Sequence, residues 1–329
     1  MNITQGLPAR PLSGFPVLTI GNFDGQHLGH QALVQAVVSC ARDRKGVPMV
    51  LTFNPHPVEV LRPGPSHVYL SDWQAKQSFF QRLGIAEIII LSFTPELAAL
   101  LPSQFVEQVL WHGLGIRKLF VGENFVFGKG RSGTIQDLRI LGEQANFTVD
   151  PISPVLVGQE IVSSTRIRKC LAAGKVQEAA QCLGRPYRLG GQVIPGDRRG
   201  TQIGWPTANI RLPAHRVFPA DGIYATIAFI EGKPHPSVSY IGTRPTFLEG
   251  ERLLEVHIFD RDVQLYGQDL AVDFVGGIRG DQAFPNVEDL LEQMKRDGVR
   301  ARAILADYDS SCSHTLESSR RKVDAVEGL

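Results

Sequence analysis

Residues 21–30 read Gly-Asn-Phe-Asp-Gly-Gln-His-Leu-Gly-His and directly follow the apolar run Pro16–Ile20. An apolar-periodic segment starts at Leu28, so the chain here predicts a buried strand, a glycine-bounded turn and a helix. His27 and His30 are then expected on one face of the first helical turn. A helix start favours bound phosphate, and two imidazoles can donate hydrogen bonds to oxygens that gain charge during phosphoryl transfer. The stretch therefore predicts a nucleotide-phosphate site.

The turn supplies further candidates for nucleotide contacts. Its glycines let backbone and phosphate approach closely. The candidates are Gly21, Asn22, Phe23, Asp24 and Gly29. The alternative is a surface histidine pair or an adventitious metal site. A zinc site would need a third and a fourth ligand at ordered spacing, and none stands out.

The bulk composition limits the classes of protein. A chain of 329 residues is long enough for two domains, and 43% hydrophobic with 20% charged residues is typical of a globular protein. A net charge of +1 argues against a dedicated nucleic-acid or membrane-surface binder. Four cysteines without paired spacing fit a reducing compartment. With no membrane span or signal peptide expected, the default prediction is a cytoplasmic protein.

The first half of the chain alternates short apolar runs with helical patterns. Such alternation predicts an α/β domain with a parallel sheet covered on both faces. The expected strands are 17–21, 48–53, 87–91, 118–121 and 147–149. The expected helices are 28–44, 71–83, 102–112 and 134–145.

Three loops follow the carboxyl ends of these strands. They carry His27 and His30, then Pro55 and His56 within Asn-Pro-His-Pro, and Asn124 within Gly-Glu-Asn-Phe. Ligands of parallel sheets bind beyond the carboxyl ends of strands, so we expect the three loops to converge on one crevice.

Two further segments concern phosphate binding. Ser164, Thr165 and Arg166 precede a helical pattern, and hydroxyls with arginines at a helix start suit a polyphosphate or form a plain cap. Residues 128–133 match G-x-G-x-x-G, but residues 123–127 separate them from the strand end, which argues against a dinucleotide fingerprint. A Gly-rich loop over a phosphate fits better.

Near residue 184 the sequence pattern changes from alternating apolar runs and helical patterns to short β-like runs. Short β-like runs bounded by Gly and Pro predict a small antiparallel barrel or sandwich. The runs are 187–194, 208–212, 222–230, 236–241, 253–259 and 270–275. One helical pattern, about 286–306, closes this region, and residues 308–329 are expected to form a weakly ordered tail.

The second half holds its own candidates. Thr207 and Asn209 point the same way on an extended segment, so their oxygens could hold Mg²⁺ together with ATP phosphates, or cap a barrel corner. Glu255 on a strand could take a proton from a substrate hydroxyl, although alternation alone favours a solvent-facing residue. Arg279 could clamp a phosphate or a ring, or be exposed. The loop before Thr207 contains Gly196, Gly200 and Gly204, which are expected to bind the nucleotide.

Taken in order, these motifs resemble the bacterial bifunctional riboflavin kinase/FAD synthetase family. The resemblance runs from about Val17 to about Ala306. It rests on GNFDGQHLGH, FNPHP, GENFVFGKGRSG and SSTRIR, and then on GRPYRLGGQVIPGD, GWPTANI, DGIYA, IGTRPTF, LEVHIFD and LYG. So many motifs in one order are highly specific.

The resemblance implies a nucleotidyltransferase (Rossmann-like) domain at 1–184 that transfers AMP from ATP to FMN, giving FAD and pyrophosphate. His27 and His30 would stabilise charge at the α-phosphorus, and Asn124 would contact a phosphate. Ser164, Thr165 and Arg166 would grip the phosphates of ATP. Pro55 and His56 would lie near the flavin or the nucleotide.

For residues 185–307 the resemblance implies a riboflavin kinase barrel with a closing helix. Thr207 and Asn209 would hold Mg²⁺-ATP, and Glu255 would activate the ribityl 5′-hydroxyl. Arg279 is expected near the flavin. Departures from the family pattern are Trp205 for Phe, Thr201 for Arg, Tyr240 for Asn and Asp281 for Glu.

The expected partners are small molecules: riboflavin, FMN and ATP. The protein is expected to be a monomer or a weak homo-oligomer. Two rival hypotheses remain. One is another adenylyl- or cytidylyltransferase with the same histidine motif and a non-catalytic β-domain, and the other is a non-enzymatic flavin carrier. The intact His27, His30, Thr207, Asn209 and Glu255 count against the carrier.

Overall fold

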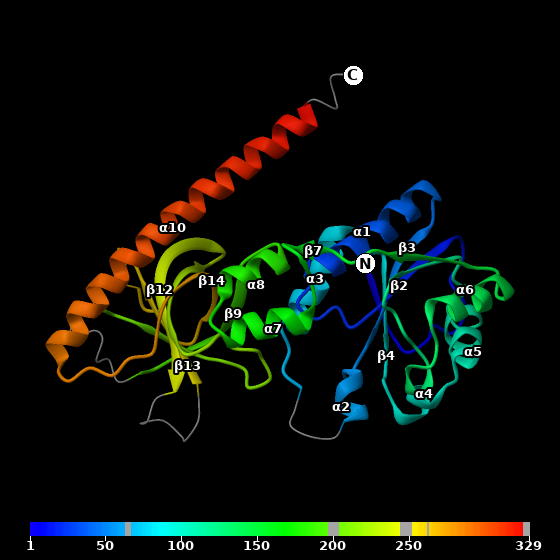
Figure 1. Cartoon of the computed structure of the whole chain (residues 1–329), viewed down its shortest axis with the longest axis horizontal. Helices are drawn as coiled ribbons and strands as arrows, with labels where there is room; N and C mark the ends of the chain where they lie inside the picture. The colour runs from blue at the N-terminus through cyan, green and yellow to red at the C-terminus, as the bar shows by residue number, and fades with distance from the viewer. Residues whose placement is uncertain (63–66, 197–203, 244–251, 262, 325–329) are drawn as a thin grey trace. The chain divides into compact units, whose positions relative to one another are not determined.

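The computed structural model describes the chain except for residues 63–66, 197–203, 244–251, 262 and 325–329 (Figure 1). Its contacts divide the chain into two compact units, Met1–Ser164 and Thr165–Leu329. This division falls before the domain boundary at 184/185 that the sequence predicted. Two helices, α7 (Ser164–Ala172) and α8 (Val176–Leu183), occupy the stretch between the two positions.

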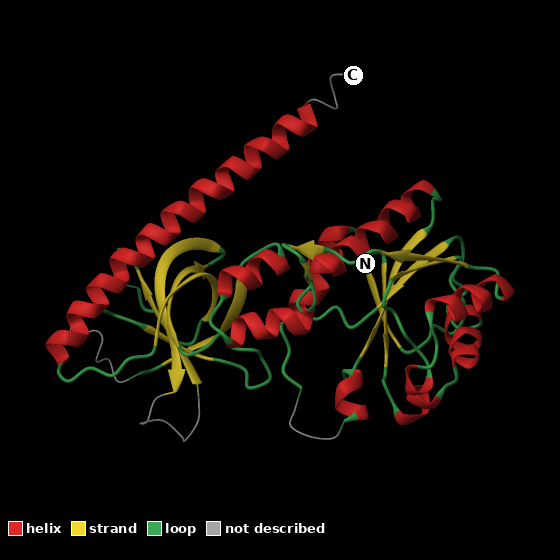
Figure 2. Ribbon diagram, viewed as in Figure 1, coloured by secondary structure: helices red, strands yellow, loops and turns green. Residues whose placement is uncertain are grey.

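The first unit is built on a six-stranded parallel sheet (Figure 2). Its order is β1-β4-β3-β2-β5-β6, and every neighbouring pair is parallel. The strands are β1 (Asn2–Gln5), β2 (Pro16–Ile20), β3 (Val47–Phe53), β4 (Glu87–Leu91), β5 (Lys118–Gly122) and β6 (Thr148–Ile152). The five predicted strands are confirmed, and β1 is an additional edge strand.

Both faces of this sheet are covered, as predicted. Strand β2 is buried at every residue, and its alternation sends Val17 into one hydrophobic cluster and Leu18 into another. Helices α1 (Leu28–Asp43) and α3 (Trp73–Leu83) supply the first cluster. The second cluster includes η1 (Val106–Trp111), a π-helical continuation of α5 (Pro102–Phe105), and α6 (Ile135–Gln144).

Shorter elements connect the main ones. They are α2 (Pro57–Leu61), α4 (Pro95–Ala99), the 3₁₀ turn η2 (Lys129–Arg131) and the hairpin of β7 (Leu156–Val157) with β8 (Glu160–Ile161). Strand order reverses at β2, because the chain runs outward through β3 and β4 and then returns to β5 on the other side. The loops that follow β2 and β5 therefore meet at a topological switch point, where α/β sheets bind ligands.

The second unit is a closed antiparallel barrel with a helix on its outer surface (Figure 1). The strand order is β10-β13-β12-β11-β14-β9, so the barrel alternative is confirmed. The strands are β9 (Tyr187–Ile194), β10 (Ala208–Arg211), β11 (Gly222–Ile230), β12 (Lys233–Thr243), β13 (Arg252–Ile258) and β14 (Asp269–Gly280).

The closing helix α10 runs Val287–Asp324 and packs Ala301 and Leu305 against outward-facing barrel residues such as Val238 and Val275. The sequence predicted its start within one residue. It also predicted a weakly ordered tail from residue 308, where the structure continues the helix. The side chains beyond Asp309 and residues 325–329 are outside the described part, so the order of the tail stays a prediction.

Candidate active sites in the two units

The stretch Gly21–His30, named the phosphate loop below, leads from β2 into α1. His27 is the N-cap residue of α1, and its Nδ1 accepts the backbone N–H of His30 at 3.4 Å. This hydrogen bond assigns the proton of a neutral His27 to Nε2. The two imidazoles stack with ring centroids 3.6 Å apart and planes 18° apart. The predicted placement of both histidines on one face of the helix start is confirmed.

Burial keeps both histidines neutral. It lowers the pKa of His27, which is 7% exposed, to about 4, although the charge of Asp24 opposes the shift. The pKa of His30 lies well below its ordinary value because of burial, with the positive charges of His27 and Lys76 adding to the effect. His30 Nδ1 is buried and has no hydrogen-bond partner among the described residues. At neutral pH the pair therefore offers N–H donors without a fixed charge.

Asp24 holds the phosphate loop in shape. Its carboxylate is 3% exposed and accepts the backbone N–H groups of Leu70, at 2.9 Å, and Ser71, at 3.2 Å. The Ser164 hydroxyl donates to the carbonyl of Asp24 at 2.9 Å. Asp24 and Ser164 thus hold the loop in place, and the contact predicted between these two residues and the nucleotide stays a prediction.

Aromatic packing fixes the remainder of the loop. Phe23 has a φ of 50° and no exposed surface, and its ring lies 5.2 Å from that of His30 and 5.1 Å from that of Phe80. A Cβ at Gly21 would come within 3.2 Å of the Phe23 ring, and one at Gly29 within 3.2 Å of the His27 ring. Both glycines therefore leave room for the rings that shape the site.

Three loops of the first unit converge on one cavity of about 810 Å³, named the loop cavity below. Gly21 and Asn22 come from the phosphate loop, His56 from the loop after β3, and Asn124 from the loop after β5. The predicted convergence is confirmed for these residues. Pro55, His27 and His30 are not among the lining residues.

The wall of the loop cavity combines aromatic rings with two arginines. The rings are Phe53, Phe93, Phe105, Phe125 and Phe127. Arg62 and Arg131 also line it, and Arg131 lies in η2, part of the Gly-rich segment 128–133. Such a wall suits a flat aromatic ring that carries a phosphate. Sequence reasoning missed the rings because their spacing resembles ordinary core residues.

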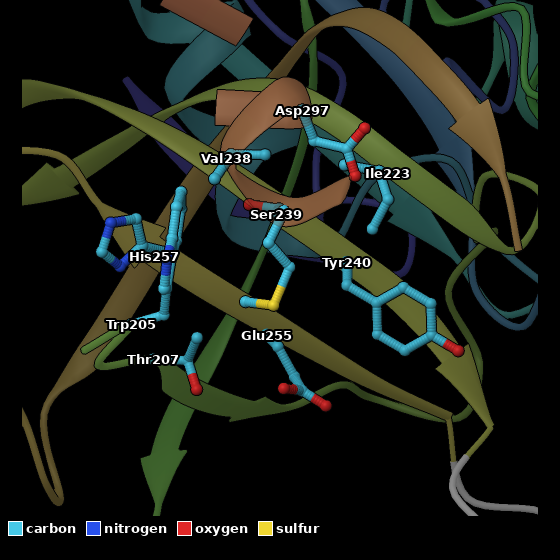
Figure 3. Close-up of a pocket in the computed structure, with 10 residues that line it drawn as sticks. Trp205, Thr207, Ile223, Val238, Ser239, Tyr240, Glu255, His257 and Asp297 are labelled. Atoms are coloured by element: carbon cyan, nitrogen blue, oxygen red, sulfur yellow. The ribbon is translucent and has the colours of Figure 1, made fainter. Parts of the chain in front are cut away.

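The second unit has a smaller pocket of about 90 Å³ on the outer face of the barrel, named the barrel pocket below (Figure 3). Glu255 and His257 line it, while the alternate residues Leu254 and Val256 are buried. Thr207 comes from the segment before β10, and Asp297 comes from α10. The remaining lining residues are Trp205, Ile223, Val238, Ser239, Tyr240 and Met294.

Asn209 carries an unsatisfied oxygen beside this pocket. The residue is 6% exposed, and its Oδ1 has no hydrogen-bond partner in the part of the chain that the structure describes. It lies directly across the strand ladder from Glu255. A Cβ at Gly196 would come within 2.2 Å of Asn209 Nδ2, so a side chain there would displace this amide. Gly204 has a φ of 79°, and Gly200 lies outside the described residues.

Arg279 is held by the closing helix. Its Nη2 lies 2.9 Å from Asp297 Oδ2, and Asp297 is only 4% exposed. Arg279 does not line the barrel pocket, but its ion-pair partner Asp297 does. Sequence reasoning missed Asp297, because nothing in a helical pattern marks one acidic residue as the partner of a distant arginine.

The predicted phosphate-binding residues Thr165 and Arg166 line neither of these cavities. Thr165 and Arg166 lie in the first turn of α7 but belong to the second unit. Their contact with ATP phosphates stays a prediction. No group of three or more His, Cys, Asp or Glu that could hold a metal ion occurs among the described residues.

Family models match both units. The FAD synthetase model matches residues 13–166, and the riboflavin kinase model matches residues 183–305. Curated relatives named bifunctional riboflavin kinase/FMN adenylyltransferase span nearly the whole chain. The protein from Escherichia coli (strain K12) is 36% identical over 87% of this chain and 91% of its own length. The one from Pseudomonas fluorescens is 37% identical over 93% and 98%.

A solved structure agrees in fold. It is described as a macrolide-efflux protein from Streptococcus pneumoniae and matches with a TM-score of 0.84 at 29% identity, covering 91% of this chain and 98% of that one. In the described part of the present chain, no helix has both the length and the apolar character needed to cross a bilayer.

The two family models define a two-domain transferase, with a nucleotidyltransferase domain on the parallel sheet and a kinase domain in the barrel. Identity over most of the chain and both family models make the assignment specific. The chain belongs to the bifunctional riboflavin kinase/FMN adenylyltransferase family.

Proposed function

We propose that the chain makes FAD in two steps at two separate sites. In the first step, ATP phosphorylates riboflavin to FMN in the barrel unit. In the second, the α/β unit transfers AMP from a second ATP to FMN, which gives FAD and pyrophosphate. The observation that carries this proposal is that each matched region contains a site of its own, the loop cavity in one and the barrel pocket in the other.

In the adenylyl step, a phosphate oxygen of FMN attacks the α-phosphorus of ATP. The bond from that phosphorus to the bridging oxygen breaks, and pyrophosphate leaves with the electron pair. The N–H groups of neutral His27 and His30 stabilise the negative charge that develops on the α-phosphate oxygens. Asn22, Gly21 and Asn124 position phosphates at the loop cavity.

Other residues support the adenylyl site. Phe23, Asp24 and Gly29 shape the phosphate loop, and Ser164 fastens it through the Asp24 carbonyl. Thr165 and Arg166 are proposed to grip the ATP phosphates. His56, next to Pro55, lines the loop cavity, where its aromatic wall is proposed to hold the flavin.

In the kinase step, Glu255 accepts the proton of the ribityl 5′-hydroxyl. The hydroxyl oxygen attacks the γ-phosphorus, the bond to the β,γ-bridging oxygen breaks, and ADP leaves. Glu255 lines the barrel pocket on a rigid strand, which fixes its carboxylate for this task. Gly196 and Gly204 flank residues 197–203. Together with Gly200, they are proposed to bind the nucleotide.

The polar groups beside Glu255 fit Mg²⁺. Asn209 Oδ1 is buried without a partner in the described chain, and an amide oxygen is a ligand that hard cations prefer. Thr207 adds a hydroxyl oxygen two residues earlier, and phosphate oxygens of ATP would complete the shell. When bound, Mg²⁺ neutralises charge on the transferred phosphoryl group. A cytoplasmic location and a monomeric or weakly associating state stay predictions.

One incubation tests the whole proposal. Purified protein is mixed with riboflavin, ATP and Mg²⁺, and the flavins are separated by chromatography over time. We expect FMN first and FAD after it. A parallel incubation starts from FMN. FAD formed from FMN but not from riboflavin would favour a nucleotidyltransferase with a non-catalytic β-domain. Flavin binding without any product would favour a carrier.

A further inference from the structure

A row of side chains crosses the outer face of the barrel. The strand register places Glu255 on β13 opposite Tyr240 on β12, Tyr240 opposite Ile223 on β11, and Ile223 opposite Arg279 on β14. On the other side, Glu255 is opposite Asn209 on β10. These five residues are named the barrel row. Directly opposed residues lie on the same face of a sheet. Tyr240 therefore sits between the proposed base and the arginine expected near the flavin.

The Tyr240 side chain lines the barrel pocket with Glu255 (Figure 3). A Cβ at Gly242 would come within 2.1 Å of the Tyr240 hydroxyl oxygen. The glycine at 242 thus makes room for the phenol, which lies along its own strand. The phenol therefore occupies space that a side chain at position 242 would fill, at the wall of the pocket.

Carboxylates surround the phenol. Burial, the charges of Asp281, Asp221 and Glu255, and a hydrogen bond to Asp281 raise the pKa of Tyr240 to about 12. The phenol therefore keeps its proton at neutral pH and directs it to Asp281. Its oxygen still has lone pairs, which can accept a hydrogen bond from a hydroxyl group of a ligand.

The barrel pocket has both apolar and oxygen-bearing lining residues. Trp205, Ile223, Val238 and Met294 supply apolar surface, whereas Glu255 and Tyr240 supply oxygens. The substrate has the same division, because riboflavin joins a flat ring to a chain of hydroxyl groups. The ribityl chain must end at Glu255, where its terminal hydroxyl loses a proton. Neighbouring strands are about 4.8 Å apart, so Tyr240 lies within reach of the preceding ribityl hydroxyls.

We propose that Tyr240, oriented by Asp281, binds a ribityl hydroxyl and thereby selects flavins that carry the polyol chain. This proposal rests on the kinase activity proposed above. Tyr240 contacts substrate directly, and Asp281 acts through Tyr240 as a positioning residue. The sequence showed both positions only as separate departures from the family pattern, and the structure brings them together.

The decisive variant is Tyr240→Phe, which removes one oxygen and keeps the ring. We expect the KM for riboflavin to rise about tenfold, the effect of one lost hydrogen bond, with the KM for ATP unchanged. Conversion of supplied FMN to FAD in the other unit serves as an internal control. Tyr308→Phe is the matched control, because Tyr308 of α10 packs against the hydrophobic cluster that α10 shares with the barrel and does not line the pocket.

Lumiflavin, which has a methyl group in place of the ribityl chain, separates contact with the polyol from contact with the ring. Its inhibition constant against the kinase should be equal in wild type and Tyr240→Phe. Asp281→Asn should raise the riboflavin KM, and the double variant should be no worse than Tyr240→Phe alone. An unchanged riboflavin KM in Tyr240→Phe, or an equal loss of lumiflavin binding, would overturn the proposal. Absence of FMN formation in wild type would instead reject the kinase activity itself.

Discussion

The two proposed sites differ in the chemical groups that they offer to related transfer reactions. The proposed adenylyl site has two neutral imidazoles at a helix start, beside a cavity of about 810 Å³ with aromatic walls. The proposed kinase site has the Glu255 carboxylate, the Thr207 hydroxyl and the Asn209 amide oxygen, at or beside a pocket of about 90 Å³. The difference follows from the nucleophiles. The FMN phosphate has already lost its proton, whereas the ribityl hydroxyl needs a base.

The two sites also differ in how the chain builds them. The phosphate loop is one continuous segment, Gly21–His30, tied down by Asp24 and by the start of α1. The barrel row takes one residue from each of five strands, so its geometry depends on the register of the whole barrel. A local substitution should therefore damage one reaction and leave the other intact.

The largest effect is expected for Glu255→Ala. Removing the proposed base should lower FMN formation about 10³-fold, within the range typical of general-base catalysis, while supplied FMN still becomes FAD. Separate assays of the two steps measure this. Glu292→Ala is a control, because Glu292 is an exposed residue of α10. Normal FMN production by the Glu255 variant would remove this carboxylate from the mechanism.

His30→Ala should give the opposite pattern. Loss of a donor to the developing charge lowers a rate by about 10²–10³-fold, so FAD formation should fall by that factor. Phosphorylation of riboflavin should continue. The exposed His112 of the first unit offers a control in His112→Ala. A folded His30 variant that lost both reactions together would contradict the division into two sites.

A smaller effect is expected for Gly196→Ala. The added Cβ would come within 2.2 Å of Asn209 Nδ2 and push the amide away from its position opposite Glu255. The Mg²⁺ concentration for half-maximal kinase activity should rise about tenfold, the effect of one weakened oxygen ligand. The Mg²⁺ dependence of FAD formation should stay the same. An identical kinase titration in the variant would argue against Asn209 as a ligand.

Local patterns in the sequence predicted the local structure of the phosphate loop. An apolar strand, glycines and a helix start all lie within Pro16–Asp43, so the positions of His27 and His30 could be inferred without any distant contact. The same logic predicted five strands of the sheet. It missed β1 (Asn2–Gln5), because that edge strand is short, polar and mostly exposed.

Long-range register explains what the sequence did not show. The alternation around Glu255 predicted its face correctly but not its neighbours, since pairing with Tyr240 is set by β12. The ion pair of Arg279 with Asp297 depends likewise on how α10 packs on the barrel. The backbone partners of Asp24, Leu70 and Ser71, lie too far along the chain to be foreseen, and its contact with the nucleotide stays a prediction.

The smallest effect concerns the stability of the first unit in mild acid. The pKa of His27 is about 4 in the folded chain, below the ordinary value of 6.5, so the unfolded chain binds the proton first as the pH falls. Stability from this group is present above pH 6.5 and is lost between pH 6.5 and 4. From pH 7 to pH 5.5, His27 alone should cost about 1 kcal/mol of unfolding free energy.

Urea unfolding of a Trp205→Phe protein measures this, because Trp73 and Trp111 then report only on the first unit. A His27→Gln variant in the same background should lose about 1 kcal/mol less between the two pH values. Glu255→Ala in that background should leave the pH dependence unchanged. Equal pH dependence with and without His27 would show that the imidazole is not buried as a neutral group. The contrast between an uncharged adenylyl site and a carboxylate kinase site would then fail.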